Sequence, residues 1–223
     1  MKFNILEGSM KIKSITDLKL FNSFYQLNLI KGFKYIDKAG EIVNLYHDEN
    51  KPPDFIMGFP GLEIKNPEKY VEVVKYSSDR LWIKFVKIDT IDQIMQFIKK
   101  PINITKDIQE VKNVSRIGWR NYFLLELNDI REISNIEKSL EIIPNTNTLL
   151  MRIAHSKNKI ESIIEIELLV DKVNKNKKAL QINADSFIQE NIWIDDVTNK
   201  TKEIMEYFKK DFIDLINQLL GEK

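Results

Sequence analysis

The chain has 223 residues, of which 43% are hydrophobic and 30% are charged, and it contains no cysteine. This length and hydrophobic content are enough to bury a full core, so we expect a folded chain rather than a disordered one. With 34 basic and 33 acidic side chains the formal net charge is only +1, so no global field attracts nucleic acid or an anionic membrane. The lack of cysteine excludes disulfides, thiol catalysis and cysteine-ligated zinc.

The first residues, MKFNILEGSMKIK, lack the apolar centre of a signal peptide. No apolar run in the chain approaches the roughly 20 residues that span a bilayer. We therefore expect a cytoplasmic protein that makes no membrane contact.

The first half of the chain reads mainly as antiparallel strands. Residues 33–47, FKYIDKAGEIVNLYH, predict a hairpin in which Gly40 supplies the flexible turn. Residues 70–88 predict a second and clearer hairpin, because alternating apolar residues flank the turn sequence Ser77-Ser78-Asp79.

A short helix and a long strand follow. Thr90 and Gln93 have the spacing of a capping box, and an apolar stripe then runs to Ile98 before Pro101 halts or kinks the helix. Residues 113–127, NVSRIGWRNYFLLEL, predict a long strand. Gly118 interrupts its pattern, where a bulge or a close neighbour is expected.

The second half repeats this arrangement. Residues 148–170 predict two strands about a turn at Ser156 to Lys159, and residues 177–194 predict one or two more strands. A final helix is capped by Asp195 or Asp196 and carries one apolar face, with Gly221 at its C-terminal cap.

Together these elements predict an α+β protein with antiparallel sheets, few helices and a long C-terminal amphipathic helix. We expect an N-terminal half over residues 1–130 and a C-terminal half over residues 131–223, which can also form one continuous domain. The similar order of strands and helices suggests two related halves.

Three segments together carry a resemblance: VEVVKYSSDRLWIKF, VSRIGWRNY, and the C-terminal LQINADSFIQ with EIMEYFKKDFIDLINQLLGE. The chain resembles, over about residues 60–221, a sporadically distributed prokaryotic family without an assigned function. The resemblance implies the architecture and an occurrence typical of mobile or defence genes. It implies no reaction, and the family's proline-led first strand is not evident here.

The stretch PDFIMGFPGLEIKN fits the sequence pattern of a nuclease metal site. In such a site Asp54 and Glu63 hold a cation, and Lys65 stabilises negative charge or activates water. No helical stripe follows Lys65, although the restriction-endonuclease-like fold needs one there. Pro60 and Gly61 also interrupt the segment. We favour the alternative in which the two carboxylates border turns and the lysine faces water.

Other candidate metal or catalytic groups are weaker. His47 lies beside acidic residues, but a histidine next to a proline-rich loop is more often a solvated loop residue. His155 is next to a predicted turn, and spacing alone gives it no catalytic partners. Asp195 and Asp196 are better explained as helix caps than as cation ligands. We therefore predict no cofactor and no metal.

The candidate binding residues lie on the strand SRIGWRNY and are Arg116, Gly118, Arg120 and Trp119. Because side chains alternate along a strand, the two arginines and the glycine share one face, and Trp119 lies on the other. Paired guanidinium donors grip phosphate or a carboxylate, and glycine lets another backbone approach.

The favoured alternative for these arginines is structural. They would pair with glutamates of neighbouring strands, for instance Glu72, Glu165 or Glu167, because IESIIEIEL alternates acid with isoleucine. We also expect at least two of Trp82, Trp119 and Trp193 to be core residues.

Three functions follow, in order of preference. The first is a non-catalytic protein-interaction subunit or adaptor, with another protein as its partner, in a mobile, anti-phage defence or toxin-linked operon. The second is a metal-dependent nuclease that uses Asp54, Glu63 and Lys65. The third is a nucleic-acid-binding module, which requires a contiguous basic face around Arg116, Arg120, Lys84 and Lys87. The balance of evidence favours a non-enzyme, and the sequence gives no oligomeric state.

Overall fold

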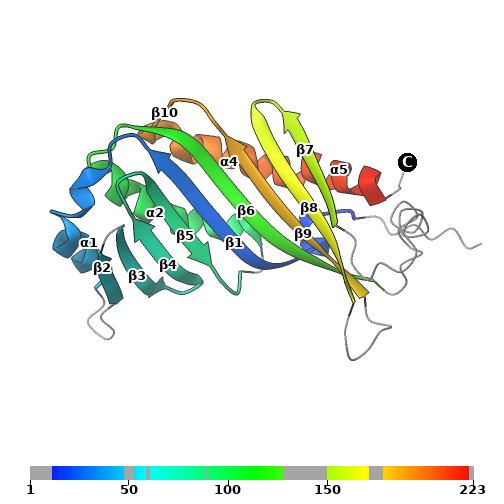
Figure 1. Ribbon diagram of the computed structural model, residues 1–223, viewed down its shortest axis with the longest axis horizontal. Coiled ribbons are helices and arrows are strands. Elements are labelled where there is room, and N and C mark those ends of the chain that lie inside the picture. The colour runs from blue at the N-terminus through cyan, green and yellow to red at the C-terminus, as the bar shows by residue number, and fades with distance from the viewer. Residues whose placement is uncertain are drawn as a thin grey trace, which may run out of the picture.

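The computed structural model describes residues 12–47, 53–58, 61–88, 90–127, 150–170 and 178–220. Within them, ten strands form one antiparallel sheet, and helices pack behind it in the view of Figure 1. The α+β class and the antiparallel sheet are therefore confirmed.

The strands are β1 (Lys19–Leu29), β2 (Asp54–Gly58), β3 (Gly61–Glu68), β4 (Val71–Tyr76), β5 (Arg80–Phe85), β6 (Asn113–Leu127), β7 (Leu150–Lys157), β8 (Ile160–Val170), β9 (Lys178–Ile188) and β10 (Ile192–Trp193). The α-helices are α1 (Ala39–Leu45), α2 (Ile91–Asp107), α4 (Val197–Lys209) and α5 (Asp211–Leu220), and the 3₁₀ turns are η1 (Ile15–Asp17), η2 (Phe33–Tyr35) and η4 (Ile194–Asp196).

The sheet order is β2-β3-β4-β5-β1-β6-β9-β8-β7, and β10 pairs with β6. β1 and β6 lie side by side at the centre. After β1 and α1, the chain forms the meander β2 to β5, whose last strand pairs with β1, and α2 follows. After β6, it forms the meander β7 to β9, whose last strand pairs with β6, and α4 follows after β10. The described part of the chain thus contains two units of like topology.

These two units share one sheet rather than two separate ones. β6, which lies before residue 130, pairs with β9 along eleven consecutive residue pairs from Ile117–Ile188 to Leu127–Lys178. The change from one topological unit to the next falls between α2 and β6.

One face of the sheet is covered by helices and holds the core. Phe208 of α4 packs its ring against Trp119 and Phe123 of β6, at centroid distances of 6.0 and 6.3 Å. Phe212 of α5 also contacts Phe123. All four aromatic side chains are fully buried, so the aromatic stripe of the C-terminal helices fixes them on this face.

The strands predicted from alternation are present. β4 and β5 form the hairpin about Ser77-Ser78-Asp79, and β6 covers residues 113–127 as expected. β7 and β8 flank a two-residue turn, Asn158-Lys159, in which both residues have positive φ. Such a turn matches the right-handed twist of the strands.

The hairpin predicted at residues 33–47 is wrong. The structure forms η2 and α1 there, and Gly40 lies inside the helix. Ile42 and Tyr46, four residues apart and therefore on one helical side, are both buried, and the Tyr46 hydroxyl bonds the Tyr76 hydroxyl at 2.7 Å. Tertiary burial of this face overrides the strand-like local pattern.

Pro101 does not end its helix, because α2 runs seventeen residues from Ile91 to Asp107 with the proline inside. The apolar stripe continues through Ile98 and Ile102, which are buried, so packing offsets the missing amide hydrogen bond. The long C-terminal amphipathic helix is confirmed, and Lys210 divides it into α4 and α5. Among the described residues, no helix has the length and apolar character to cross a membrane.

Candidate functional site

The face of the sheet opposite the helices, here called the open face, carries the predicted arginines. Arg116, Gly118 and Arg120 share it, as alternation along β6 predicts. The register of the sheet places Asp185 of β9 opposite Arg120, and Phe187 opposite Gly118. The described helices contact the other face.

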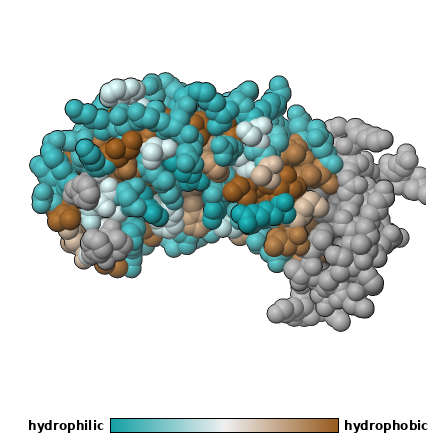
Figure 2. All heavy atoms as spheres, turned by 45° about the horizontal axis from the view of Figure 1, so that its top comes forward, coloured by the Kyte–Doolittle hydropathy of each residue, from teal (hydrophilic) through white to brown (hydrophobic). Residues whose placement is uncertain are grey.

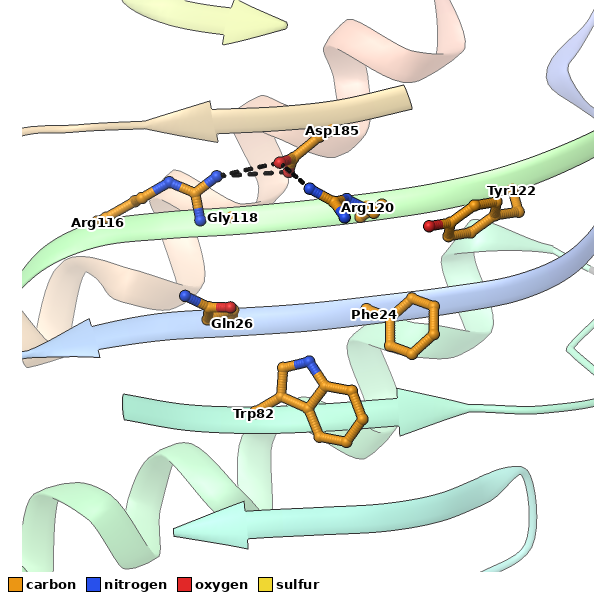
Figure 3. A pocket seen from close by; sticks show the side chains of 8 residues that line it. All are labelled: Phe24, Gln26, Trp82, Arg116, Gly118, Arg120, Tyr122 and Asp185. Carbon is orange, nitrogen blue, oxygen red and sulfur yellow. Dashed lines mark hydrogen bonds and ion pairs between the residues drawn. The ribbon is translucent and has the colours of Figure 1, made fainter. Parts of the chain in front are cut away.

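A hollow of about 410 Å³, here called the arginine pocket, lies over β5, β1, β6 and β9 (Figure 3). In the view of Figure 3, its side chains stand in front of the strands and the helices lie behind. It is lined by Phe24, Gln26, Trp82, Arg116, Gly118, Arg120, Tyr122 and Asp185.

Two guanidinium groups of the pocket share one carboxylate. Arg120 Nη2 donates to Asp185 Oδ2 at 2.7 Å, whereas Arg116 Nη2 lies 3.4 Å from both carboxylate oxygens. The Asp185 and Arg116 side chains are only 16% and 19% exposed. Burial lowers the pKa of Arg120, but its hydrogen bonds and electrostatic interactions with Asp185 and Tyr122 together outweigh burial, so the net shift of the pKa is upward. Among the lining residues, two cations and one anion leave one excess positive charge.

Gly118 accommodates the Arg116 side chain. A Cβ atom at Gly118 would lie 2.4 Å from Arg116 Nη1 and 2.9 Å from Arg116 Cζ. The guanidinium carbon also lies 4.4 Å from the centre of the Phe187 ring, within cation–π distance. The close neighbour expected at Gly118 is therefore the side chain of Arg116, held between a bare backbone and an aromatic ring.

Aromatic side chains form the other end of the pocket. Phe24 of β1 stacks on Trp82 of β5, with ring centroids 5.4 Å apart and planes at 28°. The edge of Tyr122 meets Phe24 at 5.9 Å. Phe24, Trp82 and Tyr122 are half-buried, so each keeps part of its surface available to a ligand.

A second hollow of about 680 Å³ continues this surface over β4 and β5, and Gln26 and Trp82 line both hollows. Its charges alternate in sign. Lys75 pairs with Glu63 at 2.7 Å and Lys84 pairs with Glu72 at 2.8 Å. The open face therefore combines an aromatic centre with internally paired charges.

This arrangement differs from the contiguous basic face that nucleic-acid binding requires. Lys84 and Arg120 each have a carboxylate partner within the sheet. Lys87 lies outside the strands, at a residue with positive φ. Acidic side chains thus separate the cations across this surface.

The predicted partners of the arginines are wrong in identity. Arg116 and Arg120 pair with Asp185 on the neighbouring strand, whereas Glu72 pairs with Lys84, and Glu165 accepts from Asn183 at 2.8 Å. An available signal was missed, since Asp185 is the only acid within the strand ALQINADSFI. A lone acid within a strand pattern usually has a cationic partner.

The three tryptophans separate into different environments. Trp119 is fully buried on the helix-covered face and donates to Ser23 Oγ at 2.9 Å. Trp82 is half-buried in the arginine pocket and Trp193 is 62% exposed. The expectation that two of them are core residues is therefore wrong, and Trp119, on the far side of the sheet, cannot touch a ligand in the pocket.

The trio Asp54, Glu63 and Lys65 lies on the ordinary antiparallel pair β2 and β3. Asp54 is opposite Lys65 in the register, and Glu63 bonds Lys75. Glu63 lines the second hollow, whereas Asp54 and Lys65 are exposed on β2 and β3. The trio therefore does not converge in one cleft.

The other candidates are dispersed. His47 is exposed after α1, and His155 on β7 lies 3.1 Å from the Tyr207 hydroxyl through Nδ1. Asp195 pairs with Lys106, and Asp196 occupies the N-cap position of α4 without a side-chain capping bond. Within the described ranges no group of three or more histidine, aspartate or glutamate side chains could hold a metal ion.

Comparison with known proteins identifies no family: no protein-family model matches this chain, and neither does any curated protein sequence. The resemblance to a sporadic prokaryotic family therefore stays a prediction. Function has to be argued from the open face itself.

Proposed function

We propose that the protein is a non-catalytic interaction subunit that binds another protein through the arginine pocket. The observation that carries this proposal is the pair of arginines sharing one carboxylate beside half-buried aromatic rings. Arginine and aromatic side chains in a desolvated hollow are the residue types that dominate protein-binding energy.

The charge distribution supports a protein partner over a nucleic acid. A polyanionic backbone that extends from the pocket over the second hollow would meet Glu63 and Glu72. The lysines there, Lys75 and Lys84, are already paired with these carboxylates and are not unpaired cations for a phosphate. Binding of a nucleic-acid strand relies on many unpaired cations. Protein surfaces carry both signs of charge, so they can complement this mixed face.

The position of the pocket also supports binding to an extended surface. It spans four neighbouring strands and continues into the second hollow through Gln26 and Trp82. The fixed sheet beneath it presents these side chains without the ordering cost of a loop.

The test is a comparative pull-down from the native host with tagged wild-type protein and two pocket variants, Arg116→Ala and Trp82→Ala. The control is Arg152→Ala, because Arg152 lies on β7 outside the pocket, with its side chain 66% exposed. We expect at least one stoichiometric protein that is retained by the control and lost from both pocket variants.

Two results would count against the proposal. One is a set of captured proteins that is identical for all four baits. The other is nuclease-sensitive, salt-sensitive nucleic acid that depends on Arg116, which would favour the nucleic-acid alternative.

A further inference from the structure

We infer that the partner presents an extended acidic segment, in which one carboxylate binds Arg116 and an aromatic side chain about three residues away packs on Trp82. This inference rests on the proposed function and specifies the chemistry of the same site. It follows from three features of the pocket: an imbalance in ion pairing, the spacing of the strands, and the rigid seat of one arginine.

The ion pairing leaves Arg116 available to a ligand. Its contacts to Asp185 are both 3.4 Å, while Arg120 holds the same carboxylate at 2.7 Å. An incoming carboxylate can therefore bind Arg116 without breaking the shorter pair. The one excess positive charge of the pocket matches one carboxylate, and guanidinium binds that group through two parallel hydrogen bonds.

The strand spacing sets the distance between the two binding points. Arg116 is on β6 and Trp82 is on β5, with β1 between them. Two inter-strand spacings amount to about 10 Å. A segment in the extended polyproline II conformation advances about 3.1 Å per residue with three residues per turn, so side chains three positions apart lie on one face about 9 Å apart. An acid and an aromatic residue three positions apart, in a segment that crosses the strands, therefore reach both points together.

Contacts with neighbouring residues hold the Arg116 guanidinium in place before a ligand binds. The guanidinium lies on the backbone of Gly118 and over the ring of Phe187. A side chain that is already fixed loses less conformational entropy when it binds. Gly118 is therefore a positioning residue, although it donates no side-chain contact of its own.

The experiment titrates ¹⁵N-labelled protein with a nine-residue Gly/Ser peptide in which glutamate precedes tryptophan by three positions. A matched peptide carries glutamine in place of glutamate. The Gly118 amide and the Trp82 indole resonances report on the pocket. We expect the glutamate peptide to bind about tenfold more tightly, which is the usual effect of a hydrogen bond to a charged group.

Four variants separate a ligand-binding role from a structural one. Arg116→Ala abolishes the preference for glutamate, and Gly118→Ala reduces it to about threefold or less with every charge retained, because the new Cβ displaces the guanidinium. Asp185→Asn strengthens binding of the glutamate peptide at least threefold, since both arginines then lack their internal anion. Arg152→Ala leaves the affinity unchanged.

Resonances of the helix-covered face show that each variant is folded. An equal affinity for the two peptides, or weaker binding by Asp185→Asn, would overturn the inference. So would a dT12 oligonucleotide that displaces the glutamate peptide at equal concentration. Any of these three results is compatible with the proposed function if the pull-down still shows a protein partner that Arg116→Ala and Trp82→Ala fail to capture. Retention of every partner by those variants refutes the proposed function as well.

Discussion

The aromatic cluster beneath the sheet gives a quantitative prediction for the variant Phe208→Ala. Phe208 is fully buried and its ring meets those of Trp119, Phe123, Tyr207 and Phe212 at 5.4 to 6.3 Å. Truncation of a buried phenylalanine costs about 3 to 5 kcal/mol, from lost transfer free energy and from the cavity left behind. For a chain of this size, that loss lowers Tm by about 6 to 20 °C.

The assay is urea denaturation followed by far-UV circular dichroism, together with a thermal melt. The matched control is Phe55→Ala, because Phe55 on the edge strand β2 is 54% exposed. We expect the control to change the free energy of unfolding by less than about 0.5 kcal/mol. If Phe208→Ala is no more destabilising than Phe55→Ala, the helices do not pack on the sheet as described, and the reasoning fails.

Two further variants probe hydrogen bonds between distant segments. Tyr76→Phe removes one of two buried hydroxyls that bond each other and costs about 1 to 3 kcal/mol by chemical denaturation, because it leaves Tyr46 without that partner. Burial raises the pKa of Tyr76, so the free energy of unfolding of the wild-type protein falls as pH rises above about 10. Tyr76→Phe makes this fall less steep, which urea titrations at pH 8 to 11 measure. Asn217→Ala breaks both backbone hydrogen bonds that tie Ile12 to α5, and we expect faster limited proteolysis near Ile12 with little change in the sheet core; an unchanged cleavage rate contradicts this.

Strands could be predicted where one face is buried and the side-chain period is therefore strict. β6 is the clearest case, since Ile117, Trp119 and Phe123 are buried and alternate with Arg116 and Arg120. That alternation alone placed both arginines on one face. It could not give the order of the strands in the sheet, which depends on contacts between distant segments.

The errors share a physical cause. Residues 33–47 are a short segment whose pattern fits either element, and the partner that decides between them, Tyr76, is 30 residues away from Tyr46. The lone acid Asp185 signals a cationic partner from the sequence, but which cation it meets depends on a distant segment in the same way. Asp185 is opposite Arg120 only because β9 pairs with β6, and local sequence does not contain that pairing.

The junction between the two topological units explains why the pocket combines unlike chemistry. Phe24 and Trp82 of the aromatic end come from β1 and β5 of the first unit. Tyr122 and the ionic end come from β6 and β9 of the second, the latter through Arg116 and Asp185. Neither unit carries both ends, so the pocket exists only where β1 pairs with β6. A ligand that touches both ends therefore binds the native protein but not the separated units. By mass action, such a ligand should stabilise the pairing of β1 with β6.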